Sequence, residues 1–105
     1  MSVPIDVDSP VLGLKALGEP LRWRIVELLA VEELCVCHLV EDLGVAQPLV
    51  SHHLKVLREA GLVEAERYRY WTYYRLRRDR LAELVAHLTS LAEAPPSCGG
   101  RRPCC

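Results

Sequence analysis

A glycine between two short, apolar-patterned segments constrains the fold of this chain more than any other feature. Segments 39–43 and 50–57 both place apolar residues at helical spacing. Gly44 suits the left-handed residue that ends a helix. The pair Gln47-Pro48 suits the first turn of the next helix, because the N–H that proline lacks has no partner there. Only two residues remain between these signals, so the sequence predicts a helix-turn-helix.

The rest of the chain predicts further helices and one hairpin. Apolar residues recur at helical spacing over 11–17, 21–30 and 79–92. Residues 62–76 are instead rich in β-branched and aromatic side chains, which predicts a two-stranded hairpin that turns near 67–70. The predicted fold is therefore mainly α with a β-hairpin wing, a winged helix-turn-helix.

Length and composition predict one domain with a tail. A chain of 105 residues can bury one modest core. We expect the domain to span 1–94 and the segment 95–105, with its prolines, glycines and cysteines, to be a flexible tail. No apolar run reaches the roughly 18–20 residues that cross a bilayer, and the start lacks the basic region of a signal peptide. We therefore expect a cytoplasmic protein with no membrane partner.

Charge is distributed unevenly along the chain, although the net charge is only −1. Residues 1–50 carry three basic and eight acidic side chains, whereas residues 51–80 carry eight basic and four acidic ones. A locally basic segment in an acidic chain indicates an anionic partner for that segment. A solvated surface with no partner would show the same pattern, so the charge distribution alone does not establish an anionic partner.

The predicted second helix of the helix-turn-helix presents polar side chains on one outer face. These are Gln47, Ser51, His52 and Lys55. In a major groove, glutamine can pair with adenine, while serine and lysine can bind bases or phosphates. Near the hairpin tip, Arg67 and Arg69 are expected to contact phosphates or the neighbouring minor groove. The sequence thus predicts binding to double-stranded DNA.

His53 has two interpretations. It lies on the same helical row as Val50 and Leu57, so its ring can pack and form hydrogen bonds in the core. It also neighbours His52, and we include it among the candidate DNA contacts.

Two cysteines, Cys35 and Cys37, stand two residues apart in the stretch ELCVCHL. On a regular helix their side chains would point roughly 200° apart, so two thiols that serve one site require an irregular backbone. Thiolates are soft donors and select soft or thiophilic ions. Two buried cysteines that only fill space are the alternative. The odd count of five cysteines does not suit a disulfide framework.

Three runs in order, LGEPLRWRIVELL, ELCVCHLVEDLGVAQPLVSHHLKVLREAGLV and YWTYYRL, resemble the ArsR/SmtB family of metal-responsive winged-helix repressors. The resemblance covers about residues 12–92. It implies a homodimer, built from the first and last helices, that binds a palindromic operator and leaves it when a toxic ion binds. A surplus of apolar side chains independently supports a dimer: Leu14, Leu17, Leu81, Leu84, Leu88 and Leu91.

The stretch ELCVCHL is similar to the signature of the arsenic- and antimony-responsive members. The resemblance therefore implies that Cys35 and Cys37 bind arsenite or antimonite as inducer and distort the first turn of the helix. The carboxylate–histidine zinc pattern of other members looks absent, because Leu81 stands where its first histidine would be. A Zn(II)/Cd(II)-responsive or thiol-redox-responsive repressor of the same fold is the alternative. No resident cofactor and no catalysis are expected.

A third sulfur ligand is missing from the helix, where relatives with a third cysteine would have it at Val40. Tail cysteines Cys98, Cys104 and Cys105 are the candidates. They complete the helix site, form a separate site, or have no role. We expect His38 to be a surface residue rather than a ligand.

Two positions depart from the family pattern. Ala46 stands where relatives carry a serine or threonine that caps the recognition helix. The hairpin has no glycine over residues 66–70, so we expect a wider turn there.

Overall fold

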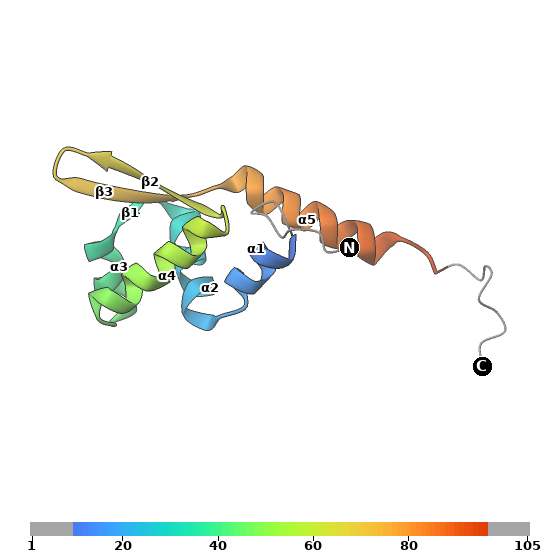
Figure 1. Ribbon diagram of the computed structural model, residues 1–105, viewed down its shortest axis with the longest axis horizontal. Coiled ribbons are helices and arrows are strands. Elements are labelled where there is room, and N and C mark those ends of the chain that lie inside the picture. The colour runs from blue at the N-terminus through green and yellow to red at the C-terminus, as the bar shows by residue number, and fades with distance from the viewer. Residues whose placement is uncertain (1–9, 97–105) are drawn as a thin grey trace, which may run out of the picture.

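The computed structural model of the chain describes residues 10–96. Within these residues, two helices precede the first strand, two more precede the two strands of the hairpin, and one helix follows them. The strands form one antiparallel sheet in the order β1-β3-β2. The elements are α1 Pro10–Leu17, α2 Pro20–Val31, β1 Leu34–Cys35, α3 Val36–Leu43, α4 Gln47–Glu59, β2 Val63–Tyr68, β3 Trp71–Leu76 and α5 Arg78–Glu93. Figure 1 shows the β2–β3 hairpin projecting beyond α3 and α4 as a wing. The predicted winged helix-turn-helix is confirmed.

Helix ends follow the signals in the sequence. Gly44 ends α3 with a φ of 68°, and Gly61 follows α4 with a φ of 79°, both in the left-handed region that glycine tolerates. Glu19 caps α2 by accepting a hydrogen bond from the backbone N–H of Arg22 at 2.8 Å. Ala46 precedes α4 and provides no side-chain cap, as its methyl group requires. The amide groups at the start of α4 are therefore not bonded by a capping side chain.

The wing turn is tighter than predicted. Tyr68 pairs with Trp71, so only two residues connect the strands and the expected wider turn is wrong. Arg69 supplies the backbone conformation that a glycine usually provides, with a φ of 56°. A left-handed residue other than glycine costs roughly 1–2 kcal/mol, and the pairing of two six-residue strands offsets this.

A second difference is β1, which the sequence did not predict. Its two residues pair antiparallel with β3, Leu34 opposite Tyr74 and Cys35 opposite Tyr73. The stretch that leads into α3 is thereby joined to the wing.

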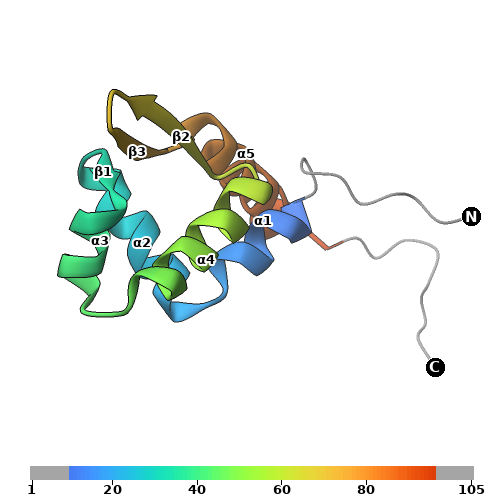
Figure 2. The same ribbon diagram turned by 60° about the vertical axis from the view of Figure 1, so that its left-hand side comes forward.

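The core lies between α2, α3, α4 and the base of the hairpin. The predicted stripe on α4, Val50, Leu54 and Leu57, is at most 1% exposed. Ile25 and Leu29 of α2 and Leu39 of α3 meet it, and all are at most 2% exposed. The interior of the helix-turn-helix is therefore fixed by packing. Figure 2 shows α3 and α4 joined by their short turn, with α2 beside them.

Helices α1 and α5 pack against each other away from the wing. A Cβ added at Gly13 would lie 2.8 Å from Leu84, so the two helices approach closely there. Leu84 is buried within the protomer, which corrects its place in the predicted apolar surface. Exposed apolar residues nevertheless remain on both helices: Val11, Leu14, Val85, Leu88 and Leu91. Among residues 10–96, no helix has the length and apolar character that spanning a membrane requires.

Candidate metal centre and nucleic-acid interface

The two helix thiols lie on different kinds of backbone. Cys35 ends β1 and precedes α3 with extended angles, φ −88° and ψ 169°. Cys37 lies in the first turn of α3. The backbone between the two thiols is therefore not a regular helix, as their i, i+2 spacing predicted. Distortion of the first turn of α3 by a bound ion stays a prediction. The chain is already irregular at the one position where irregularity is needed.

His38 completes a cluster with the two thiols. One ligand atom from each of Cys35, Cys37 and His38 lies within 4.8 Å of the others. His38 Nδ1 is 3.2 Å from Cys35 Sγ and accepts the backbone N–H of Cys35 at 3.4 Å. An imidazole nitrogen that accepts a hydrogen bond is unprotonated, so it could bind a metal once it gives up the long 3.4 Å bond from Cys35. His38 is exposed, as expected, yet its position also makes it a candidate ligand that the sequence interpretation had set aside.

The two thiols differ in acidity. Burial raises the pKa of the Cys35 thiol, but hydrogen bonds from the Cys37 thiol and from the His38 and Cys37 backbones outweigh it, so the net pKa is lowered. The hydrogen bond to Cys35 is the main cause that raises the pKa of the Cys37 thiol. Cys35 is therefore the first of the pair to become a thiolate, and the exposed Cys37 stabilises it.

A cavity of about 200 Å³ opens beside the thiols. One wall belongs to the start of α3, one to the first residue of α4, and one to the wing turn. Its lining residues are Cys35, Val36, Cys37, Gln47, Tyr70, Trp71 and Thr72. The sequence interpretation missed the wing residues, because only the pairing of β1 with β3 brings them near the cysteines.

The outer face of α4 presents the predicted polar residues together. Gln47, Ser51, His52 and Lys55 are all exposed along one side of the helix. Leu49 is also exposed, at 44%, and was not predicted. An apolar side chain at this place can contact the methyl group of thymine. The helix therefore presents the mixed polar and apolar surface that base recognition in a major groove uses.

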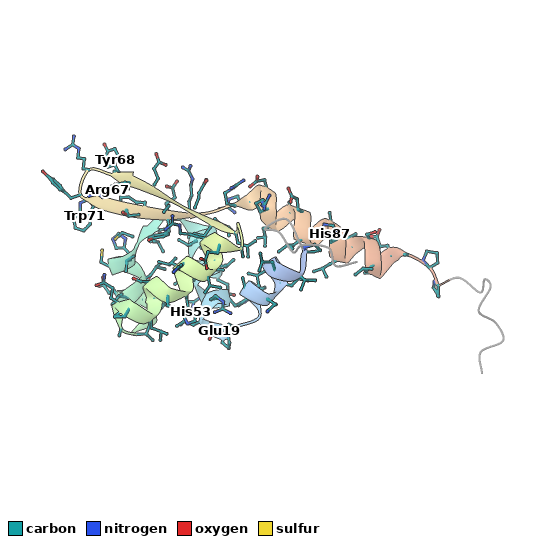
Figure 3. All side chains as sticks on the ribbon, viewed as in Figure 1. Glu19, His53, Arg67, Tyr68, Trp71 and His87 are labelled. Atoms are coloured by element: carbon teal, nitrogen blue, oxygen red, sulfur yellow. The ribbon has the colours of Figure 1, made fainter. Side chains whose placement is uncertain are left out.

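His53 does not belong to this face. It is only 7% exposed, and Arg22 Nη1 of α2 donates a hydrogen bond to its Nδ1 at 3.1 Å. Glu19 Oε2 lies 3.8 Å from the same nitrogen. Figure 3 labels both residues, which lie near each other. Burial is the main cause that lowers the pKa of His53, which favours the neutral ring. Arg22 can only donate, so Nδ1 accepts and a neutral ring would carry its proton on Nε2. We therefore remove His53 from the candidate DNA contacts, since its ring holds α4 to α2.

The wing carries its basic residues at the tip. Arg67 and Arg69 are exposed, whereas Arg75 is paired with Glu64 at 2.6 Å and Glu66 at 2.8 Å. Arg67 and Arg69 thus remain candidates for phosphate or minor-groove contacts. Cys98, Cys104 and Cys105, the predicted tail ligands, lie outside the described residues.

Comparisons with known proteins agree with this geometry. The model of the bacterial regulatory protein arsR family matches residues 19–65. An uncharacterized HTH-type transcriptional regulator of Methanocaldococcus jannaschii is 40% identical over 72 residues, covering 68% of this chain and 81% of the relative. The arsenic resistance transcriptional regulator ArsR1 of Pseudomonas putida is 43% identical over 72 residues, covering 68% of this chain but only 56% of the relative.

A solved structure extends the comparison to the fold. It is the homodimeric winged helix-turn-helix DNA-binding domain Mb0332 of Mycobacterium bovis, described as a possible ArsR-family regulator. The identity is 31% and the TM-score 0.68, over 89% of this chain and 91% of the other. The chain belongs to the ArsR family of DNA-binding transcriptional repressors and is not an enzyme.

Proposed function

We propose that this repressor senses arsenite or antimonite through Cys35 and Cys37 and releases its operator when the ion binds. The observation that carries the proposal is the cluster of two thiols and one imidazole, with ligand atoms within 4.8 Å, at the start of the first helix of the helix-turn-helix. The likeness to a relative named as an arsenic resistance regulator supports the choice of ion. The reducing cytoplasm, where we place the protein, keeps such thiols free.

The chemistry of arsenite suits this donor set. Arsenous acid carries three hydroxyl groups on a pyramidal arsenic. Each thiol that binds forms one As–S bond, and its proton leaves with one hydroxide as water. Binding by Cys35 and Cys37 thus releases two waters and leaves one hydroxyl group on arsenic. Because the pKa of Cys35 is lowered, its thiolate attacks first.

The third ligand has two sources. His38 Nδ1 is close to both thiols and would give a set of two sulfurs and one nitrogen. A tail cysteine, Cys98, Cys104 or Cys105, would give three sulfurs and a stronger preference for arsenic or antimony. Two sulfurs with one imidazole also suit Zn(II). The identity of the third ligand therefore decides how well the protein distinguishes arsenite from zinc and cadmium.

We propose that the repressor acts as a homodimer on a palindromic operator. The exposed apolar residues of α1 and α5, among them Leu14, Leu88 and Leu91, form the face we assign to the partner subunit. A homodimeric structural relative supports this assignment. Two copies would place their α4 helices about one turn of DNA apart, ~34 Å.

The free-energy coupling needed for induction is modest. The factor by which the ion weakens DNA binding cannot exceed the factor by which it prefers the DNA-free conformation. Allosteric coupling free energies are typically about 1–3 kcal/mol, which corresponds to roughly 5- to 150-fold in DNA affinity. Cys35 belongs to β1 and Cys37 to α3, so an ion that holds both fixes the angle at which α3 begins. α3 packs directly on α4, so we expect this angle to reach the recognition helix.

A thiol-redox sensor is the second candidate. The Cys35 and Cys37 thiols share a hydrogen bond, and the lowered pKa of Cys35 favours its oxidation. Oxidation by peroxide would form a sulfenic acid on Cys35, and attack by Cys37 would release water and form a disulfide.

The test is operator binding with and without ligand. A fluorescent duplex selected by the wild-type protein from a random pool serves as operator, and anisotropy reports binding. Arsenite, antimonite, Zn(II), Cd(II) and peroxide are added separately. We expect arsenite to weaken wild-type binding at least about fivefold and to have no effect on Cys35→Ser/Cys37→Ser.

Two control variants separate the alternatives. Replacement of Cys98, Cys104 and Cys105 by serine tests the tail, and His38→Ala tests the imidazole. Release by arsenite that survives loss of both helix thiols would contradict the proposal. Release by peroxide alone would favour the redox sensor, and release by Zn(II) or Cd(II) alone would favour a metal repressor of the other type.

A further inference from the structure

The β1–β3 pairing puts Cys35 and Trp71 on the same face of the sheet. Cys35 lies opposite Tyr73 in the antiparallel ladder, and Trp71 precedes Tyr73 by two residues on β3. Side chains at such diagonal positions share a face and are roughly 7–8 Å apart, within reach of an aromatic ring. The thiol site and the wing tip are thus neighbours, although about 35 residues separate them in the chain.

The cavity beside the thiols joins the same residues. Its roughly 200 Å³ is lined by both cysteines on one side and by Tyr70, Trp71 and Thr72 on the other. Figure 3 shows Trp71 at the wing tip, on the end of the hairpin that overhangs α3. Gln47, the first residue of α4, closes the third side. An ion on the thiols, with its remaining ligand, would therefore occupy space that the sensor shares with both DNA-binding elements.

The walls of this cavity are not equally rigid. α4 is anchored below Gln47 by Val50, which is fully buried. The wing tip has no comparable anchor, because Trp71 is 54% exposed and Tyr70 91% exposed. β1, the strand that holds β3 to the thiol site, is only two residues long. Of the three walls, the wing is therefore the least anchored.

We propose that Trp71 is the positioning residue through which an ion at Cys35 and Cys37 displaces the wing. This proposal rests on the function proposed above. Without the ion, the indole packs over the cavity and sets the wing at the angle at which α4 and the wing contact one duplex together. The bound ion fills the cavity, the indole leaves it, and the wing swings away from the DNA. A winged helix that loses its wing contacts keeps only part of its affinity.

The first test compares DNA release in matched variants. The ratio of duplex Kd with and without arsenite is measured for wild type, Trp71→Ala, Trp71→Phe and Tyr68→Ala. Tyr68 is an exposed aromatic on the same wing that does not line the cavity. For wild type and Tyr68→Ala we expect a ratio of at least about fivefold, and for Trp71→Ala one within about twofold of unity. Trp71→Phe, which keeps an aromatic ring, should restore part of the ratio.

A second measurement follows the indole directly. The chain contains two tryptophans, so Trp23→Phe leaves Trp71 as the sole indole fluorophore. We expect arsenite to change the emission of this variant, and Cys35→Ser/Cys37→Ser in the same background to abolish the change. This readout requires no DNA binding, so it stays informative if Trp71→Ala binds the duplex poorly.

The outcomes distinguish this proposal from the function on which it rests. Wild-type release together with equal release from Trp71→Ala would overturn the role of Trp71 and leave the arsenite sensor intact. An unchanged emission from Trp71 at saturating arsenite would overturn it as well. No release from the wild-type protein would instead overturn the proposed function, and with it this inference.

Discussion

The two helices of the helix-turn-helix carry their polar chemistry in different places, α3 at its start and α4 in its middle. The residue that precedes α3 is Cys35, whose thiol lies 3.2 Å from His38 Nδ1 and lines a cavity. The middle of α4 is His53, buried and hydrogen-bonded to Arg22 of a different helix. The start of α3 thus borders space that a ligand could fill, whereas the middle of α4 is bonded to α2. Under the function proposed above, this difference would separate the ion site from the DNA-contacting helix within one motif.

The largest expected effect tests whether α3 is fixed in its interior. Leu39 is fully buried, so Leu39→Ala should lower the free energy of unfolding by about 2–5 kcal/mol, measured by urea denaturation. Leu49→Ala, on the exposed face of α4, is the control and should change it by less than about 0.5 kcal/mol. Equal effects of the two substitutions would mean that α3 is not anchored in the core. They would contradict the idea that α3 is fixed in its interior while its start is open to a ligand.

A smaller effect is expected at the start of α4. Ala46→Ser supplies the missing cap and should raise the free energy of unfolding by about 1 kcal/mol. Pro48 has no N–H, so the new hydroxyl would accept from the Leu49 amide, which already donates to the Ala46 carbonyl at 3.1 Å. Because no amide open to phosphate is covered, we expect DNA binding to stay unchanged. Ala94→Ser, at the exposed end of α5, is the matched control for stability and binding. An unchanged free energy of unfolding in Ala46→Ser would contradict the idea that α4 gains from a capping side chain.

The smallest effect is a pH dependence in the middle of α4. Burial lowers the pKa of His53, so the folded state binds fewer protons than the unfolded state. The stability that the neutral ring contributes is present above the ordinary histidine pKa of about 6.5 and is lost as the pH falls below it. Glu19, whose pKa is lowered mainly by the Arg22 amide, loses its contribution only in a more acidic range.

Urea denaturation at several pH values between 8 and 5 would measure how the free energy of unfolding falls with pH. Each unit by which folding lowers the pKa of His53 contributes about 1.4 kcal/mol to this fall. His53→Gln, which keeps an acceptor for Arg22 without titrating, should flatten the curve. His52→Gln, on the exposed neighbour, should leave it unchanged. An identical slope in His53→Gln would show that the ring does not couple α4 to α2 in the way described.

Local signals in the sequence predicted most of the fold. Gly44 and Gly61 marked helix ends because few other residues adopt a positive φ, and helical spacing marked the buried face of α4. The wing turn was misjudged because Arg69 takes a conformation that its own preference disfavours and that strand pairing imposes.

The site was less predictable because it depends on long-range pairing. Cys35 and Cys37 stood out by their spacing, but Trp71 joins them only through the register of β1 and β3. The position of His38 did have a local signal. Cys35 immediately precedes α3, and a polar side chain three residues later often accepts a hydrogen bond from the backbone N–H of such a residue, as His38 does. The burial of His53 followed from its row on α4, and the competing interpretation as a DNA contact failed for that reason.

The close approach of α1 and α5 at Gly13 has a consequence for which operators the protein fits. If two subunits meet through these helices, the close packing of Gly13 against Leu84 helps to set the distance between the two α4 helices of the dimer. A methyl group at Gly13 would lie 2.8 Å from a terminal carbon of Leu84, so that side chain would have to shift. A larger side chain that Leu84 could not avoid would move α1 and α5 apart. Such a change would alter the preferred spacing between half-sites, although Gly13 touches neither ion nor duplex.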